Sequence, residues 1–121
     1  MMRSILGGER FNHHLLIVTD RENAYVAADK IRSYATGKYT VVGLVLVDDD
    51  SYVGSTYLDI PVISDKDHIE VSIQDKWVDD VFIFTKPENA LSEKTMLNFS
   101  AMGITTHTRL DMQYERHSEF T

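Results

Sequence analysis

Short apolar runs alternate along the chain with amphipathic stretches, and this alternation predicts the fold. Five segments have the composition of strands, because they are rich in valine, isoleucine and leucine and are bounded by polar or turn residues. They are residues 13–20, 39–50, 60–64, 79–86 and 104–110. Three further segments repeat apolar residues at helical spacing. They are residues 24–34, 66–77 and 89–103.

Strand and helix follow one another through the whole chain, which predicts an α/β fold with a Rossmann-like parallel sheet of about five strands. Right-handed crossovers between strands in the order 3-2-1-4-5 place helices on both faces of such a sheet. The chain has 121 residues, the size of one domain. We therefore predict a single domain over residues 13–121, preceded by a flexible lead-in over residues 1–12.

The apolar positions within the helical segments indicate which side chains face the core. In the second segment, Ile69, Ile73 and Trp77 recur every four residues. In the third segment, the predicted core positions are Leu91, Met96, Leu97 and Met102. Trp77 is thus assigned to the core, together with Phe82 and Phe84 of the fourth strand.

Composition and charge narrow the classes of partner. The net charge is -7 and the pI about 5.0, which disfavours binding to the phosphates of nucleic acid or to anionic lipid. The chain has no cysteine, which fits a reducing compartment, and its five histidines lack the spacing of a zinc site. The apolar runs are too short to span a bilayer, so the chain is expected to be soluble as it stands.

Ligands of such a sheet bind at the carboxyl ends of the strands, near the switch point between the first and fourth strands. Four loops are expected to meet there, at residues 19–24, 48–50, 64–67 and 85–89. The candidate nucleotide-binding residues taken from them are Thr19, Asp20, Arg21, Glu22, Asn23, Asp48, Asp49 and Thr85. No residue is assigned a catalytic or metal-binding role.

The loop after the first strand lacks the glycines that let backbone amides approach a pyrophosphate. The glycine positions are filled by Thr19, Arg21 and Ala24. Asp20 and Glu22 would also repel a phosphate, so NAD is disfavoured. Two interpretations stay open: Arg21 and the amides near Asn23 hold a single phosphate or a sugar nucleotide, or Asp20 or Asn23 simply caps the helix.

Three aspartates follow the second strand at residues 48–50. An acidic residue at this place holds the ribose hydroxyls in dinucleotide-binding folds, and clustered carboxylates attract Mg²⁺. An acidic loop exposed to solvent is the plainer interpretation. A nucleotide or nucleotide-sugar is therefore the open candidate ligand, and no cofactor is assigned.

Three strings together resemble a known family: "GLVLVDDD" at 43–50, "DIPVI" at 59–63 and "VDDVFIF" at 78–84. With them the chain, from about residue 15 to residue 110, resembles the Rossmann-like, CoA-binding-type soluble domain of bacterial polyprenyl-phosphate sugar-1-phosphate transferases, the undecaprenyl-phosphate galactose or glucose phosphotransferases.

This resemblance implies a non-catalytic regulatory or scaffolding domain, a fragment of a larger membrane protein. The parent would initiate capsule, exopolysaccharide or O-antigen synthesis from a UDP-sugar at the cytoplasmic side of the bacterial inner membrane. Its partners would be the other domains of the transferase, with a second copy of the chain as an open alternative, and membrane contact would come only through the missing parts.

Three alternatives remain from the sequence. A related domain precedes the dehydrogenase part of membrane-bound nucleotide-sugar dehydratases and epimerases, where the first loop more often keeps its glycines. A small NAD-binding protein would use Asp48 or Asp49 for the ribose. A response-regulator-like receiver would need a phosphoacceptor aspartate at the end of a middle strand and a lysine after the last one, and neither stands out.

Overall fold

The computed structural model describes residues 12–34 and 37–108 of the chain. Its centre is a mostly parallel sheet with the strand order β3-β4-β2-β1-β5-β6. The strands are β1 (His13–Thr19), β2 (Tyr39–Leu46), β3 (Thr56–Tyr57), β4 (Ile60–Asp65), β5 (Asp80–Phe84) and β6 (Thr105–Thr108). Apart from the short β3, which pairs antiparallel with β4, this is the predicted order 3-2-1-4-5. The predicted α/β, Rossmann-like fold is confirmed.

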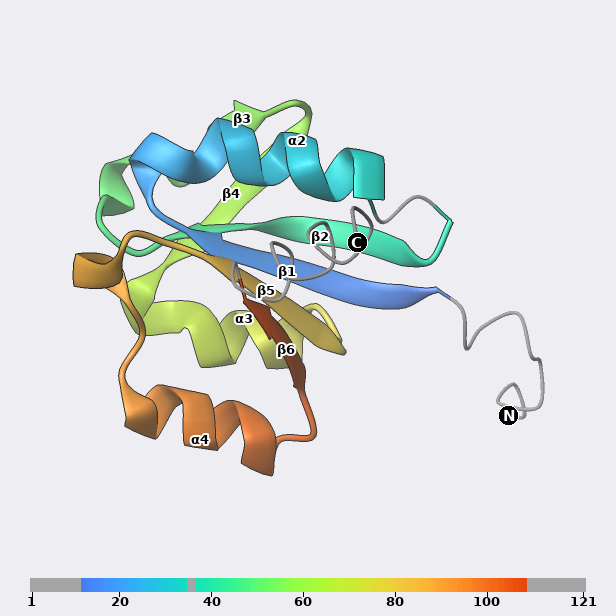
Figure 1. The fold of residues 1–121 in the computed structure, drawn as a ribbon, viewed down its shortest axis with the longest axis vertical. Coiled ribbons are helices and arrows are strands. Elements are labelled where there is room, and N and C mark those ends of the chain that lie inside the picture. Colours follow the sequence, from blue (N-terminus) through green and yellow to red (C-terminus); the bar gives the residue numbers. More distant parts are fainter. Residues whose placement is uncertain (1–11, 35–36, 109–121) are drawn as a thin grey trace, which may run out of the picture.

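Helices cover both faces of the sheet (Figure 1). One face carries α2 (Ala24–Tyr34), and the opposite face carries α3 (Ile69–Asp75) and α4 (Glu93–Ala101). Short 3₁₀ turns precede or replace helices in the loops: η2 (Arg21–Asn23), η3 (Asp50–Tyr52), η4 (Lys66–His68) and η5 (Pro87–Asn89). Between β2 and β4 the chain forms η3 and β3 and no α-helix.

The core lies in two layers, one on each side of the sheet, as the continuous apolar run of β1 predicts. Leu15 and Ile17 pack toward α2, whose buried positions are mostly alanine. Leu16 and Val18 pack on the other side, against α3 and Phe99 of α4. Because successive residues of a strand point to opposite faces, β1 anchors both layers at once.

Gly43 occupies a crowded point in β2. A Cβ at this position would lie 2.7 Å from Cγ2 of Ile63, the residue passed over by the register shift between β2 and β4. The side chain of Ile63 therefore lies directly against the bare backbone of Gly43. The glycine in the valine-rich run is explained by this close approach.

We expect Gly43→Ala to lower the free energy of unfolding by about 1–2 kcal/mol, because the branched Ile63 side chain must move to admit a methyl group. Urea unfolding followed by circular dichroism measures the change. In an Ile63→Ala background the same substitution should cost clearly less, since the contact is gone. An equal cost in both backgrounds would contradict this explanation.

Two predicted core residues are exposed instead. Trp77 has 79% of its surface exposed and a φ of 55°, because α3 ends at Asp75 and the following turn directs Val78, not Trp77, into the core. Leu97 is 64% exposed, because α4 is rotated so that Met96, Phe99 and Met102 face the sheet. The assignments of Trp77 and Leu97 to the core were wrong, and those of Phe82 and Phe84 are confirmed.

Candidate functional site

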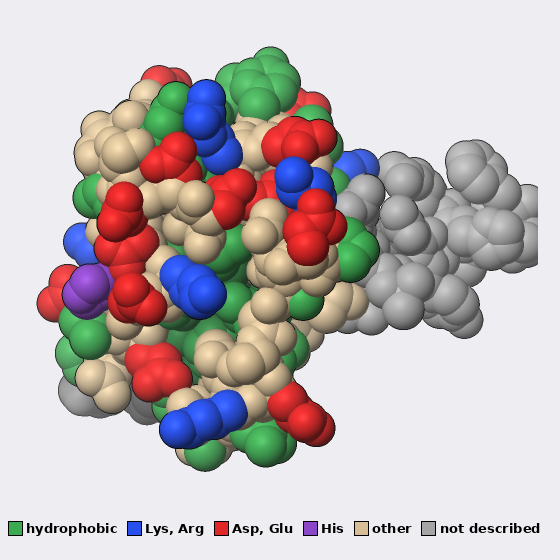
Figure 2. Space-filling view, turned by 90° about the vertical axis from the view of Figure 1, so that its left-hand side faces the viewer, with side chains coloured by type: hydrophobic (Ala, Val, Ile, Leu, Met, Phe, Trp, Pro, Cys, Tyr) green, Lys and Arg blue, Asp and Glu red, His purple; other side chains and the backbone are tan. Residues whose placement is uncertain are grey.

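The loops after β1, β2, β4 and β5 meet at one edge of the sheet, where the sequence places them. Figure 2 looks at this edge and shows acidic side chains around a hollow that exposes hydrophobic surface. Hydrogen bonds between the loops join them into one surface. Arg21 N, after β1, donates to Asp48 Oδ1, after β2, at 2.9 Å, and Lys86 Nζ, after β5, donates to Glu22 Oε1 at 2.8 Å.

Asp20 is the hub of this edge, although none of its surface is exposed. Its Oδ1 accepts from Asn23 N at 3.1 Å and from Asn23 Nδ2 at 2.7 Å. Its Oδ2 accepts from Lys86 N at 2.8 Å and from Asn89 Nδ2 at 3.1 Å. Burial by itself would raise the pKa of Asp20, but the hydrogen bonds from Lys86, Asn89 and Asn23 outweigh it and hold the pKa below 3.8. Asp20 is therefore ionised, and its carboxylate connects the loop after β1 to the loop after β5.

The two candidate threonines differ in exposure. Thr19 is fully buried, and its Oγ1 donates to the backbone oxygen of Phe84 at 2.6 Å. It thereby links β1 to β5 and is closed to a ligand. Thr85 is half-buried in the loop directly after β5.

Arg21, Asp48 and Asp49 form a second set of contacts between the β1 and β2 loops. The Arg21 guanidinium lies over the ring of Tyr52, 4.7 Å from its centroid, and 3.4 Å from Asp49 Oδ2. Hydrogen bonds from Ser51, followed by the charge of Arg21, lower the pKa of Asp49. The acidic residues after β2 thus bind the protein's own loops.

Glu22 lies at the rim, with 71% of its side chain exposed. Its hydrogen bond and negative charge raise the pKa of Lys86, with which it forms the 2.8 Å pair. Glu22 and Lys86 are partners of each other at the edge of the loops. The charged end of each side chain is thus engaged by the other and is not presented to a ligand on its own.

Together these contacts fill the place where a pyrophosphate would lie. Phosphates bind to backbone amides at the start of the helix that follows the first strand. Here Arg21 N donates to Asp48, and Asn23 N and Lys86 N donate to Asp20. Of the two interpretations left open by the sequence, the capping role of Asp20 is the one seen, because its side chain accepts from Asn23 N.

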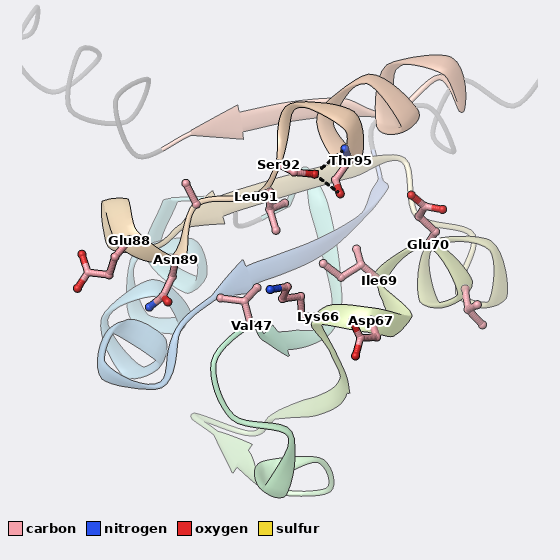
Figure 3. A pocket seen from close by; sticks show the side chains of 12 residues that line it. Val47, Lys66, Asp67, Ile69, Glu70, Glu88, Asn89, Leu91, Ser92 and Thr95 are labelled. Carbon is pink, nitrogen blue, oxygen red and sulfur yellow. Dashed lines mark hydrogen bonds between the residues drawn. The ribbon is translucent and has the colours of Figure 1, made fainter.

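An open cleft of about 500 Å³ lies beside this filled loop, between the starts of α3 and α4. Val47, Ile69 and Leu91 form its apolar part, and Lys66 extends along Val47 into it (Figure 3). Asn89 lines the side nearest the β1 loop. None of the eight candidate residues lines this cleft, although Lys66 and Asn89 fall within loops expected to converge here.

Carboxylates dominate the surroundings of this cleft and of a shallower hollow of about 350 Å³ next to it. The acidic residues that line the two are Asp48, Asp49, Asp50, Asp65, Asp67, Glu70 and Glu88, and the one basic residue is Lys66. Within residues 12–34 and 37–108, no group of three His, Asp or Glu side chains is arranged to hold a metal ion. Several of these carboxylates accept hydrogen bonds from the protein's own donors, among them Asp48 from Arg21 N and Asp65 from Asp67 N.

A second polar cluster, which the sequence analysis did not predict, lies toward the opposite, amino-terminal ends of the strands. Asp80 is buried, and its two oxygens lie 2.9 Å from His13 Nδ1 and 2.9 Å from His107 Nε2. The Tyr39 ring lies edge-on to both imidazoles. Burial, then the charge of Asp80 and a hydrogen bond to it, raise the pKa of Tyr39. The sequence signal for this cluster is weak: His13 and Asp80 each begin a strand, whereas His107 lies inside β6.

We expect Asp80→Asn to lower the pKa of Tyr39 toward 10.0, because it removes the negative charge that opposes the tyrosinate and leaves burial as the main cause. Alkaline titration of tyrosinate absorbance measures this, with Tyr39→Phe identifying the transition of Tyr39. Asp79→Asn removes a neighbouring exposed carboxylate and should leave the transition in place. An unchanged Tyr39 titration in Asp80→Asn would contradict the arrangement.

No protein-family model and no curated protein matches the sequence. Among solved structures, the chain is similar to RSP, a Rex-family repressor, with a TM-score of 0.65 and 15% sequence identity. The match covers 97% of this chain and 62% of the repressor, so the chain spans less than two thirds of that protein's length. At this identity the likeness shows the Rossmann-like fold alone.

These comparisons correct several expectations. The resemblance to a sugar-phosphate transferase domain was wrong, because the fold matches a repressor and no transferase. The prediction that the partners are the other domains of a transferase and, through its missing parts, a membrane was therefore also wrong. The expected exclusion of nucleic acid was also wrong, since the protein of similar structure is a repressor. Across the described residues, no helix combines the length and apolar character needed to cross a membrane.

Proposed function

We propose that this chain is a regulatory binding domain that takes a small ligand in the cleft between α3 and α4 and does not hold a dinucleotide on the loop after β1. The observation that carries the proposal is the buried Asp20 carboxylate. It accepts from the amide of Asn23, a donor that a pyrophosphate at this loop would need, and from the amide of Lys86 in the neighbouring loop after β5. The open space lies beside the loop instead, in a cleft whose volume suits a small molecule.

A structural connection between the cleft and α2 supports the regulatory part of the proposal. Asn89 lines the cleft, and its Nδ2 donates to Asp20 Oδ2. The other oxygen of Asp20 holds Asn23, the last residue before α2 begins at Ala24. A ligand that contacts Asn89 therefore acts on the start of α2 through one shared carboxylate. The similarity in fold to a repressor, which is a regulatory protein, agrees with this role.

The first experiment is an NMR titration of the whole chain with NADH and NAD⁺. We expect the amide signals of Arg21 and Asn23 to stay in place, because their N–H groups already donate to carboxylates. Because the Arg21 amide donates to Asp48 and lies outside the connection from Asn89 through Asp20 to Asn23, a saturable shift of Arg21 together with Asn23 would show that the loop holds a dinucleotide, and would overturn the proposal.

The second experiment measures amide hydrogen exchange in Asn89→Ala. We expect the Asn23 amide to exchange about tenfold faster, since a hydrogen bond to a charged group contributes about 1.5–3 kcal/mol and part of that holds the loop. Glu88→Ala is the matched control, because this neighbouring carboxylate points away from the centre of the cleft (Figure 3). Equal exchange in wild type and Asn89→Ala would exclude the connection from the cleft to α2.

A further inference from the structure

The electrostatics of the cleft between α3 and α4 bear on the class of its ligand. Carboxylates surround the opening, whereas the single lysine reaches inward (Figures 2 and 3). Arg21 and Lys86, the other cations of this edge, are both engaged in ion pairs. Within the described parts of the chain, no carboxylate lies within ion-pairing distance of the Lys66 ammonium. Lys66 is thus the donor available to a ligand.

Asn89 complements Lys66 with an acceptor. Because the Asn89 Nδ2 donates to the Asp20 carboxylate, which can only accept, the orientation of this amide is fixed. Its Oδ1 is then the atom left for a ligand in the cleft. Lys66 extends toward the Asn89 side of the cleft (Figure 3). The two together offer a donor and an acceptor to the same molecule.

An apolar patch lies between the polar groups that make up most of the lining of the cleft. Val47, Ile69 and Leu91 come from three different loops and elements and line the same space. Small-molecule sites combine apolar surface with placed polar groups, and in this cleft the polar groups take the larger share. A flat ring whose edge carries both an acceptor and a donor, as in an amide or a nucleobase, suits this surface.

The surrounding charge excludes phosphate. Seven carboxylates and one lysine line the cleft and the hollow beside it, and a phosphate group carries one to two further negative charges at neutral pH. The amides that would otherwise neutralise a phosphate are occupied by Asp20 and Asp48. An uncharged ligand enters this field without repulsion.

We infer that the cleft binds an uncharged, phosphate-free molecule of nucleoside type and rejects its phosphorylated forms. The inference rests on the proposed function, since it concerns the ligand of the same cleft. It reverses the preference of a dinucleotide-binding loop, in which the phosphates provide the anchor.

NMR titrations of the whole chain with adenosine, AMP and ATP test the inference. We expect adenosine to shift the amides of Val47, Lys66 and Leu91, and ATP to bind about tenfold more weakly at low salt, with the difference shrinking as salt screens the carboxylates. Lys66→Met should weaken adenosine binding more than Lys66→Gln, which keeps a donor without the charge.

Two double variants with equal changes in net charge provide the matched control. Asp50→Asn with Asp67→Asn removes charge at the cleft and at the hollow beside it, and should narrow the difference in affinity between adenosine and ATP. Asp29→Asn with Asp75→Asn removes the same charge from exposed positions on α2 and α3 and should leave the difference as it is.

Three results would overturn the inference: ATP binding as tightly as adenosine, adenosine shifting only Arg21 and Asn23, or no shift with any of the three compounds. The last result would contradict the inference about the ligand class, but it would not contradict the proposal that Asp20 occupies the loop after β1. Shifts of Arg21 and Asn23 by NADH would instead remove the proposed function, so the two failures are distinguishable.

Discussion

Replacing Asp20 with alanine is expected to lower the free energy of unfolding by about 3–5 kcal/mol, a large part of the stability of a domain this size. The substitution removes the acceptor of four hydrogen bonds in a fully buried place. The amides of Asn23 and Lys86 would be left without it, and a buried unsatisfied donor costs about 1–3 kcal/mol. Urea unfolding at neutral pH measures the loss.

The control for Asp20→Ala is Glu22→Ala, two residues along the same turn. Glu22 is mostly exposed and pairs with Lys86 at the surface, so its removal should leave the unfolding midpoint unchanged. Similar losses in the two variants would show that charge on this turn, rather than the buried hydrogen bonds, carries the stability.

The contribution of Asp20 should also depend on pH. Because its pKa is lower in the folded state than the ordinary 3.8, the ionised carboxylate contributes fully above that value. The contribution is lost as the pH falls through the folded pKa. The difference in stability between wild type and Asp20→Ala should therefore be constant near neutral pH and narrow below pH 3.8.

Replacing Phe99 with alanine is also expected to lower the free energy of unfolding by about 3–5 kcal/mol, because it leaves a cavity in place of a fully buried ring. Phe99 is the one residue of α4 that is completely buried in the core on this side of the sheet. The packing of α4, and with it one wall of the cleft, depends on this ring. Thermal and urea unfolding measure the change.

Leu97→Ala is the matched control on the same helix, two residues away. Leu97 is exposed, and alanine is the better helix former, so we expect a change within about 0.5 kcal/mol. A large loss for Leu97→Ala and a small one for Phe99→Ala would show that α4 is rotated as the sequence predicted, not as the structure has it.

The sequence was sufficient for the sheet and its order because the signal for buried parallel strands is strong. The run from Leu15 to Val18 is buried on both faces, and α2 begins and ends where its alanine spacing predicts. The failures lie where several side chains compete for one face. Trp77 keeps the helical spacing of Ile69 and Ile73, but the turn after α3 places Val78 in the core.

For the candidate site, the sequence predicted which loops meet but not which atoms face each other. Asp20 was expected to repel a phosphate and Asp48 to hold a ribose, yet the role seen for both, accepting from the loop amides, depends on side-chain directions. Lys66 and Asn89 line the cleft from two of the expected loops, but they match no motif. The cluster of Asp80 with His13 and His107 brings together residues far apart in the chain. It could not be predicted because no local pattern connects these residues in the sequence.

The filled loop after β1 also limits how this protein can change in evolution. Asp20→Gly alone would remove the carboxylate that occupies the loop, but it would leave the amides of Asn23 and Lys86 and the Asn89 side chain without their common acceptor. A phosphate-binding descendant would need compensating changes in two loops at the same time. Single substitutions would lead through an unstable intermediate, so we expect selection for stability to oppose a change of this loop to phosphate binding.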